Sequence, residues 1–209
     1  MTEPRLEHAH DIRRRPVLVR VLTGPPGASL LGATALTGLL TLYAFSVPGG
    51  YFLATLAAMA GTCVLGIVWI PRFVVAALRR DGRPGLRRHW ARWIAVPVIG
   101  AVVVGLVMLD LPFRARFVVS QPHLTRLAQA VNSGTEPERQ GGRRVGLFPV
   151  DNVQRFGGGI LFDIEGAGFL DSHGIAWSPR GEPGPGEDGY DRIQYEHLTG
   201  PWYTWEEPW

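Results

Sequence analysis

The chain has 209 residues, a formal net charge of +3 and one cysteine, Cys63. A single cysteine excludes an intramolecular disulfide and a metal site built on several cysteines. Residues 114–209 carry thirteen acids against nine arginines, so the second half lacks the basic balance of a nucleic-acid-binding domain, and no nucleic-acid partner is expected.

Three apolar runs lie in the first half of the chain, at residues 30–47, 51–70 and 93–109, and none of them contains Asp, Glu, Lys or Arg. A helix rises about 1.5 Å per residue and needs roughly 20 residues to cross a hydrocarbon layer about 30 Å thick. The runs therefore predict a membrane α-helical region at 28–113. Its three transmembrane helices are expected at 30–47, 51–70 and 93–113, in contact with the lipid bilayer.

The distribution of arginine predicts the orientation of these helices. The Pro-Gly-Gly sequence at 48–50 fits a tight turn and predicts an antiparallel helical hairpin. The next connection, 71–92, carries seven arginines and one acid, and residues 1–27 are also basic. Arginine-rich segments remain in the cytoplasm. We therefore expect a multi-pass plasma-membrane protein with a cytoplasmic tail at 1–27 and an extracytoplasmic domain at 114–209.

Asp110 is the acid closest to a predicted span, at the outer end of the third one. An ionisable group deep in a membrane is a functional candidate, but this position is near enough to the interface for hydration. Pairing with Arg114, one helical turn later, is the other expectation. An ion pathway through the spans is therefore not predicted.

Residues 114–209 predict a small α+β domain with short antiparallel strands. Ser120, followed by Pro122 and by apolar residues at helical spacing, predicts the start of a helix that ends near residue 132. Residues 135–144 are expected to form a loop and the glycines at 157–159 a turn. Strands are predicted at 145–150, 160–164, 168–170, 175–177, 192–198 and 202–205. The turn composition of 171–174 makes 169–177 a predicted hairpin, and 178–189 an exposed loop.

Several polar residues of this domain are of the types found in catalytic and metal-binding sites. The Asp-Ser-His sequence at 171–173 has the residue types of a hydrolase triad, but consecutive residues in a turn point apart, whereas a triad converges from separate elements. Glu196 with His197, and His173 with His123, have metal-ligand chemistry, yet neighbours on a strand face opposite sides and no His-Glu-x-x-His spacing is present. The sequence therefore predicts no catalytic residue, metal ligand or cofactor.

The end of the chain is rich in aromatic residues, with three Trp and one Tyr within 202–209. One interpretation is a strand buried in the core. The other is an aromatic platform for a sugar or peptide of the cell envelope, formed by Trp202, Tyr203 and Trp205 with Glu206 as a polar contact.

The second half resembles an uncharacterised family of actinobacterial multi-pass membrane proteins that end in a small soluble domain. The resemblance is carried by the segment 120–130, Val-Gly-Leu at 145–147, Gly-Phe-Leu-Asp at 168–171, Gly-Ile-Ala-Trp-Ser-Pro at 174–179 and Gly-Pro-Trp-Tyr at 200–203. It implies a membrane-anchored protein and supplies no activity and no catalytic residues.

The function predicted from these features is non-enzymatic: an integral plasma-membrane protein that presents an interaction or envelope-associated domain outside the cytoplasm. Two alternatives stay open. One is an envelope hydrolase whose site in the C-terminal domain uses His173, Asp171 or Glu196. The other is an accessory subunit whose small-residue helix faces pack against a larger membrane protein. The sequence does not give an oligomeric state.

Overall fold

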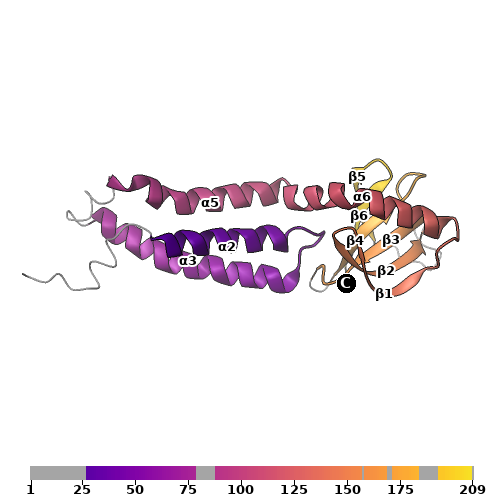
Figure 1. The fold of residues 1–209 in the computed structure, drawn as a ribbon, viewed down its shortest axis with the longest axis horizontal. Helices are drawn as coiled ribbons and strands as arrows, with labels where there is room; N and C mark the ends of the chain where they lie inside the picture. The colour runs from indigo at the N-terminus through magenta and orange to yellow at the C-terminus, as the bar shows by residue number, and fades with distance from the viewer. Residues whose placement is uncertain (1–26, 79–87, 157, 169–170, 184–192, 209) are drawn as a thin grey trace, which may run out of the picture.

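The computed structural model describes residues 27–78, 88–156, 158–168, 171–183 and 193–208. Four helices and a six-stranded antiparallel sheet are found in these residues. The helices α2 (Ala28–Ala44), α3 (Phe52–Leu78) and α5 (Trp90–Met108) lie side by side, and the sheet lies beyond one end of them with α6 (Leu111–Asn132) (Figure 1).

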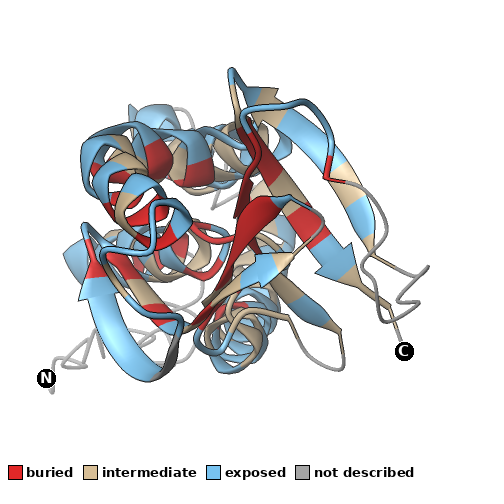
Figure 2. Cartoon of the chain, turned by 90° about the vertical axis from the view of Figure 1, so that its right-hand side faces the viewer, coloured by how far each residue is buried: buried red, intermediate tan, exposed pale blue. Residues whose placement is uncertain are grey.

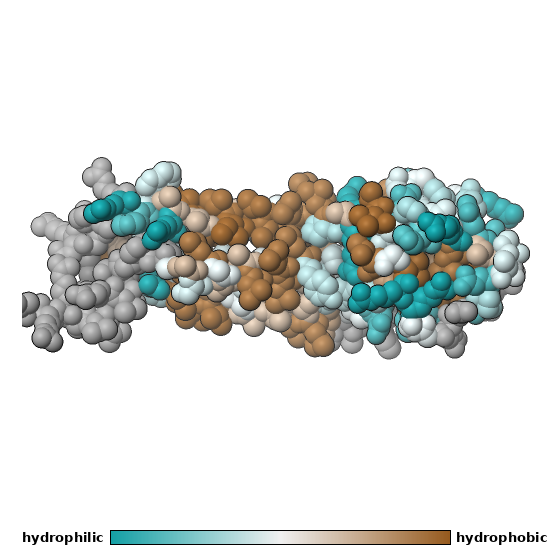
Figure 3. All heavy atoms as spheres, in the orientation of Figure 1, coloured by the Kyte–Doolittle hydropathy of each residue, from teal (hydrophilic) through white to brown (hydrophobic). Residues whose placement is uncertain are grey.

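Two helices, α3 and α5, are long and apolar enough to cross a membrane. Their 27 and 19 residues correspond to lengths of about 40 and 28 Å at the rise of an α-helix. The helix α2 is also apolar, but its 17 residues make it shorter than α3 and α5. Large apolar side chains such as Leu53, Ile67 and Val102 are exposed on the three helices, which forms a hydrophobic band between two polar ends (Figure 3).

The predicted helical hairpin is present, and small residues allow its helices to approach closely. A Cβ added at Gly61 of α3 would lie 3.1 Å from the side chain of Thr37 in α2. At Gly38 of α2, an added Cβ would lie 2.9 Å from Val103 of α5. Close backbone approach of this kind is typical of helices packed in lipid. The helix α2 therefore packs against both neighbours.

The third apolar run ends earlier than the expected residue 113. The helix α5 ends at Met108, and Asp110 has a left-handed backbone with φ 52°. A new helix, α6, begins at Leu111 with Pro112 in its first turn, where the missing N–H of proline costs no hydrogen bond. The left-handed residue separates α5 from α6, so the domain begins with a helix and not with a flexible linker.

The expected helix start at Ser120 is wrong, because α6 already begins at Leu111 and continues through Pro122. Ser120 is fully buried in the middle of this helix, and its Oγ accepts a hydrogen bond from the N–H of Leu147 at 2.9 Å. A serine that looks like a cap in the sequence is therefore a contact between the helix and the sheet.

The sheet has the strand order β1-β2-β3-β4-β6-β5, and every neighbouring pair is antiparallel. Side chains alternate between its two faces. One face packs on α6 and forms the main core, where buried residues gather (Figure 2). The other face carries a smaller cluster of Leu161, Ala176, Tyr203 and Trp205. The strands are β1 (Arg139–Val145), β2 (Phe148–Phe156), β3 (Gly159–Ile164), β4 (Ser172–Trp177), β5 (Gln194–Thr199) and β6 (Trp202–Glu207).

Three local predictions for this domain are wrong. Residues 139–144, expected as part of a loop, belong to the edge strand β1, and the expected strand at 145–150 contains the turn between β1 and β2 at Gly146, whose φ is 61°. Residues 172–174 of the expected turn belong to β4. This strand pairs with β6 from Ser172 onward and with β3 from Gly174 onward. Of the strand expected at 168–170, residues 169 and 170 lie outside the described residues. The expected turn at 157–159 is found between β2 and β3, with Gly158 at φ 81°; residue 157 is not described.

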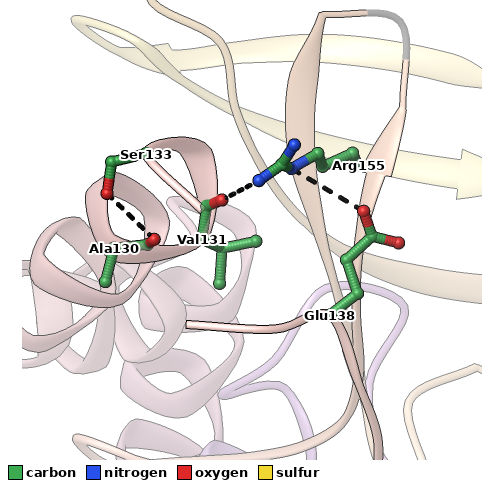
Figure 4. Close-up of polar contacts among 5 residues, drawn as sticks. All are labelled: Ala130, Val131, Ser133, Glu138 and Arg155. Atoms are coloured by element: carbon green, nitrogen blue, oxygen red, sulfur yellow. Dashed lines mark hydrogen bonds and ion pairs between the residues drawn. The ribbon is translucent and has the colours of Figure 1, made fainter. Parts of the chain in front are cut away.

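The C-terminal end of α6 is fastened to the sheet and to the following segment (Figure 4). The guanidinium of Arg155, on β2, donates a hydrogen bond to the carbonyl of Val131, and its Nε lies 3.7 Å from Glu138. The hydroxyl of Ser133 donates to the carbonyl of Ala130 at 3.1 Å. These groups satisfy carbonyls that the last turn of a helix leaves without a partner. They fix α6 across the sheet.

Candidate functional site

The turn between α2 and α3 is joined to the sheet domain by backbone hydrogen bonds. The N–H of Gly168, in the connection from β3 to β4, donates to the carbonyl of Gly50 at 2.9 Å. Next to this bond, Tyr51 and Ala167 form an isolated antiparallel bridge. The domain is therefore attached to the helical bundle twice, through the chain connection from α5 to α6 and through this turn.

Arg116, on the first part of α6, strengthens the same junction. Its Nη1 donates to the hydroxyl of Ser46 at 2.7 Å, and its Nε donates to the carbonyl of Leu147 at 3.2 Å. The guanidinium carbon also lies 4.9 Å from the ring centre of Phe148 and 5.6 Å from that of Tyr51. A planar guanidinium suits this combination of hydrogen bonds and ring contacts, whereas an ammonium does not. One side chain thus connects the helical turn, α6 and the turn between β1 and β2.

A cleft with a volume of about 470 Å³ opens beside this junction. Its walls come from the α2–α3 turn, from the start of α6, from β5 and from the ends of β4 and β6. Three carboxylates line it, those of Asp110, Glu196 and Glu206, against one guanidinium, that of Arg114. Aromatic rings of Phe45 and other residues line it as well. The cleft is therefore acidic, part apolar, and open to solvent.

Asp171, His173 and Glu206 converge at the sheet side of this cleft. A nitrogen of His173 and a carboxylate oxygen from each acid lie within 4.8 Å of one another. The register explains the convergence, because His173 on β4 is the direct partner of Glu206 on β6, and Asp171 precedes His173 by two residues. Alternate residues of an extended chain point to the same side. All three side chains can therefore reach one point between them.

The imidazole of His173 is held by two glycines from different parts of the chain. Gly49, in the α2–α3 turn, has φ 68°, and a Cβ added there would lie 2.3 Å from Cδ2 of the ring. Gly168 has φ 78°, and its added Cβ would lie 2.5 Å from the same atom. Any side chain at either position would collide with the ring. The absence of a Cβ at both positions lets backbone surround the imidazole and fix its orientation.

The structure separates the other residues that the sequence suggested for chemistry. Ser172 is exposed and, as the strand residue between Asp171 and His173, points to the other face of β4. His197 lies against the ring of Tyr203, with 5.1 Å between ring centres, and its Nε2 lies 3.0 Å from the carbonyl of Gly200. Glu196 lines the cleft from β5. It lies two residues after Gln194, which is the strand partner of Glu206. His123 is exposed on α6.

The members of the predicted aromatic platform fall into two groups. Trp202 is buried in the main core, where its ring is 5.6 Å from that of Phe117. Tyr203 and Trp205 are buried in the smaller cluster on the other face, although part of Trp205 also borders the cleft. Glu206 is exposed and lines the cleft. Within this set, Trp205 and Glu206 are the residues that reach the cavity.

Two groups of the sheet domain, Asp163 and Tyr195, have shifted pKa values, and Tyr195 also borders the cleft. Burial raises the pKa of the Asp163 carboxyl above its ordinary value, and Asp151 and Glu207 raise it further, while a hydrogen bond with Asn152 opposes the shift. Burial, assisted by Glu182, raises the pKa of the Tyr195 hydroxyl to about 12. Both groups favour their neutral forms. They act on the stability of the sheet and do not belong to the cluster around His173.

From the sequence, Asp171 and His173 were candidates for one hydrolase site, with Ser172 or with Glu196, whereas Glu206 was expected only in the aromatic platform. The available signal was the spacing of Asp171 and His173, which on a strand places them on one side. Comparisons of the chain with protein-family models, with curated proteins and with solved structures found no match. The interpretation of the site therefore depends on its geometry.

Proposed function

We propose that this chain is an integral plasma-membrane protein with three membrane-spanning helices, which presents its sheet domain outside the cytoplasm as a non-enzymatic interaction domain. The observation that carries the proposal is the polarity of the molecule along its long axis. The sheet domain lies at one end of the apolar bundle, and the C-terminal end of α3 and the N-terminal end of α5 lie at the other (Figure 1). In the sequence, Arg72, Arg88 and Arg92 belong to these two helix ends.

The packing of α2 supports a third span. Its 17 residues extend about 26 Å, near the lower limit for crossing the hydrocarbon layer. The hydroxyls of Thr34 and Thr41 each donate to a carbonyl four residues earlier in the same helix, at 2.9 Å. Polar side chains that are satisfied within their own helix suit an apolar solvent. With Leu36 and Leu39 exposed, α2 fits the same layer as α3 and α5.

The orientation in the proposal follows from the positive-inside rule. The arginine-rich segment between α3 and α5 and the basic residues 1–27 belong on the cytoplasmic side. The α2–α3 turn then lies on the outer side, beside Asp110 and the start of α6. This places the cleft at the level of the outer lipid headgroups and makes the domain accessible to the cell envelope.

The cleft is the proposed interaction site, and its charge selects the kind of partner. Three carboxylates against one guanidinium favour a partner that contributes a cationic or hydrogen-bond-donating group. The rigid double attachment of the domain supports a binding function, because a preformed cleft loses little entropy when a partner binds. The partner is either a component of the cell envelope or another membrane protein. The latter is the accessory-subunit alternative, and stable co-purification in mild detergent would favour it.

An envelope hydrolase is the second candidate, and the convergence of Asp171, His173 and Glu206 is the observation that favours it. A hydrolase that attacks through a side chain needs a nucleophile next to its base. Thr204 lines the cleft, but its hydroxyl donates to the carbonyl of Glu196 at 3.5 Å. This arrangement supports binding over covalent catalysis. A hydrolytic activity of the purified protein that disappears in His173→Gln would replace the non-enzymatic proposal.

The topology is tested by labelling intact cells with a membrane-impermeant thiol reagent. In a Cys63→Ala background, a single cysteine is placed at Arg180, exposed in the loop after β4, or at Ala91, exposed in the first turn of α5. Labelling at 180 in intact cells, and at 91 only after lysis, is the expected result. Labelling of 91 but not of 180 in intact cells would place the domain in the cytoplasm and contradict the proposed orientation.

The interaction is tested with a photo-crosslinking amino acid at Gln194, which lines the cleft, and in a matched variant at Gln154, whose strand partner Leu161 belongs to the other face of the sheet. We expect one discrete crosslinked product from Gln194 in intact cells. It should weaken when Glu206 is replaced by Ala. Equal products from both positions would show that the cleft is not the interaction site.

A further inference from the structure

We infer that Asp171, His173 and Glu206 form a binding site for a divalent transition-metal ion, with Zn²⁺ as the preferred ion. The inference deepens the proposed function and rests on it in one respect, because the metal site borders the cleft that is proposed as the interaction site. It starts from the convergence of one imidazole nitrogen and two carboxylate oxygens within 4.8 Å. Imidazole with two carboxylates is a donor set that suits Zn²⁺ or Mn²⁺, whereas Ca²⁺ and Mg²⁺ prefer oxygen donors alone.

The size of the cluster matches a metal site that closes with small side-chain movements. Donor atoms bound to Zn²⁺ at about 2.0–2.2 Å in a tetrahedral arrangement are roughly 3.3–3.6 Å apart. The three atoms of the cluster lie within 4.8 Å of one another. Rotation of the carboxylates by about 1 Å closes this difference, and Glu206 is free to rotate because it is exposed.

The surroundings hold the central ligand in a fixed orientation. The imidazole of His173 lies against the backbone of Gly49 on one side and Gly168 on the other, close enough that a Cβ at either glycine would lie within 2.5 Å of Cδ2. The hydrogen bond between Gly168 and Gly50 keeps these two walls together. A histidine that is oriented before the metal arrives binds it with less loss of entropy.

The open side of the cluster supplies space for the remaining coordination positions. The cleft of about 470 Å³ borders His173 and Glu206, so water or a group of a bound partner can reach the ion. Three protein donors with an open fourth position are the arrangement of accessible zinc sites, whereas purely structural sites have four protein donors. Two carboxylates with a neutral imidazole also balance the charge of a divalent ion.

The site also has a structural consequence, because its ligands are contacted by the α2–α3 turn. Gly49 belongs to that turn, while His173 and Glu206 belong to the sheet and Asp171 directly precedes β4. A metal ion that fixes the His173 ring fixes the surface on which the turn rests. Binding of Zn²⁺ should therefore slow the exchange of the Gly168 amide, whose hydrogen bond joins the two parts.

The test measures binding of Zn²⁺ and Co²⁺ to the full chain in lipid nanodiscs, purified without a polyhistidine tag. His8 and His10 form a separate His-x-His pair in the N-terminal segment, so both are replaced by Ala in every protein that is compared. The single variants are His173→Gln, Glu206→Gln and Asp171→Asn. The matched controls are His197→Gln, whose imidazole faces Tyr203, and Glu207→Gln, whose carboxylate lies next to Glu206 in sequence but near Asp163.

The expected result is one Zn²⁺ per chain, with a dissociation constant that rises at least about tenfold in each cluster variant and stays unchanged in both controls. Co²⁺ should give the visible absorption of a bound, four- or five-coordinate ion in the parent protein and in the controls. Addition of Zn²⁺ should raise the unfolding midpoint of these proteins but not that of the cluster variants. A cooperative unfolding transition without metal, with a midpoint close to that of the parent protein, shows that the cluster variants fold.

Two results would overturn the inference. One is the absence of saturable binding in the parent protein. The other is equal binding by parent, cluster variants and controls, which would identify binding to scattered surface carboxylates. Thiol labelling at positions 180 and 91 is independent of both. If the domain is cytoplasmic but binds Zn²⁺ through the cluster, the proposed topology is refuted and the metal site is kept. If the domain is extracytoplasmic but does not bind Zn²⁺, the metal site alone is refuted.

Discussion

Replacement of Arg116 by Ala tests whether the sheet domain is fastened to the helical turn as the contacts indicate. The guanidinium donates to Ser46 at 2.7 Å and to the carbonyl of Leu147, and lies over the rings of Tyr51 and Phe148. Ala at this position removes all of these contacts together. It leaves the α6 backbone intact, because Ala is a strong helix former.

The magnitude follows from the separate contacts. The part-buried bond to Ser46 contributes about 1.5 kcal/mol, the more exposed bonds to Leu147 about 1 kcal/mol, and the ring contacts about 0.5 kcal/mol. The junction should therefore lose about 3 kcal/mol in Arg116→Ala. Arg116→Lys keeps the charge but reaches one acceptor at a time, so it should lose roughly half of that amount.

Hydrogen–deuterium exchange in nanodiscs measures the loss at the junction itself. The amide of Gly168 bonds to Gly50, so its exchange reports opening of the contact between turn and domain. A loss of about 3 kcal/mol corresponds to an opening that is roughly 100-fold more frequent. Arg126→Ala, at an exposed position on the same helix, is the matched control. If Gly168 exchanges at the same rate in Arg116→Ala and in Arg126→Ala, the junction does not depend on Arg116.

Three further substitutions test the packing of the domain by thermal or chemical unfolding. Gly49→Ala should destabilise the protein by about 1–3 kcal/mol more than Gly158→Ala, since both glycines have positive φ but only the former would collide with His173; equal losses would contradict the contact. Ser120→Ala should cost about 1 kcal/mol, because the part-buried hydrogen bond from the N–H of Leu147 loses its acceptor, and a neutral effect would show that this N–H finds another one. Asp163→Asn should raise the free energy of unfolding at pH 7, because the raised pKa means that the charged carboxyl destabilises the folded state. This gain should shrink as the pH falls through the raised pKa and disappear below 3.8, where the carboxyl is largely protonated in both states, and a gain independent of pH would refute that explanation.

The helical half of the fold was more accessible from sequence than the sheet. The Pro-Gly-Gly turn between two apolar runs gave a hairpin, because composition and length alone define such helices. The break after the third helix was missed because Asp110 has a left-handed backbone, which an aspartate adopts only in a suitable tertiary context. The continuation of α6 through Pro122 was missed for a related reason. Packing against the sheet stabilises a helix that propensity alone would end.

The edge strand β1 was missed because its sequence lacks the alternation that identifies strands. Residues 139–145 are polar, contain two glycines and pair with β2 across a register shift between 140 and 143. Charged, irregular edge strands of this kind resist pairing with other molecules. Val145 and Phe148 suggested one continuous strand, but Gly146 between them turns the chain, at a point where any Cβ would collide with Ser120.

The cluster in the cleft depends on pairing between segments that are distant in sequence. Glu206 reaches His173 because β4 pairs with β6 and not with β5. Gly49 reaches the same ring from the first helical hairpin. Neither contact has a local pattern in the chain. The two-residue spacing of Asp171 and His173 was visible, but the turn composition of 171–174 led to a hairpin prediction that separated them.

The bridge between Tyr51 and Ala167 sets an order of events during biosynthesis. Its partners are 116 residues apart, the difference between positions 167 and 51. The hairpin of α2 and α3 is synthesised first, and each of its helices satisfies most of its own backbone hydrogen bonds. The N–H groups of Gly50 and Tyr51 have partners within the hairpin, but the carbonyl of Gly50 waits for Gly168 until the third strand has been made. A ribosome that adds about 5–20 residues per second needs several seconds to make that interval. During this time the carbonyl of Gly50 lacks the partner that it has in the finished protein, and docking of the completed domain supplies it.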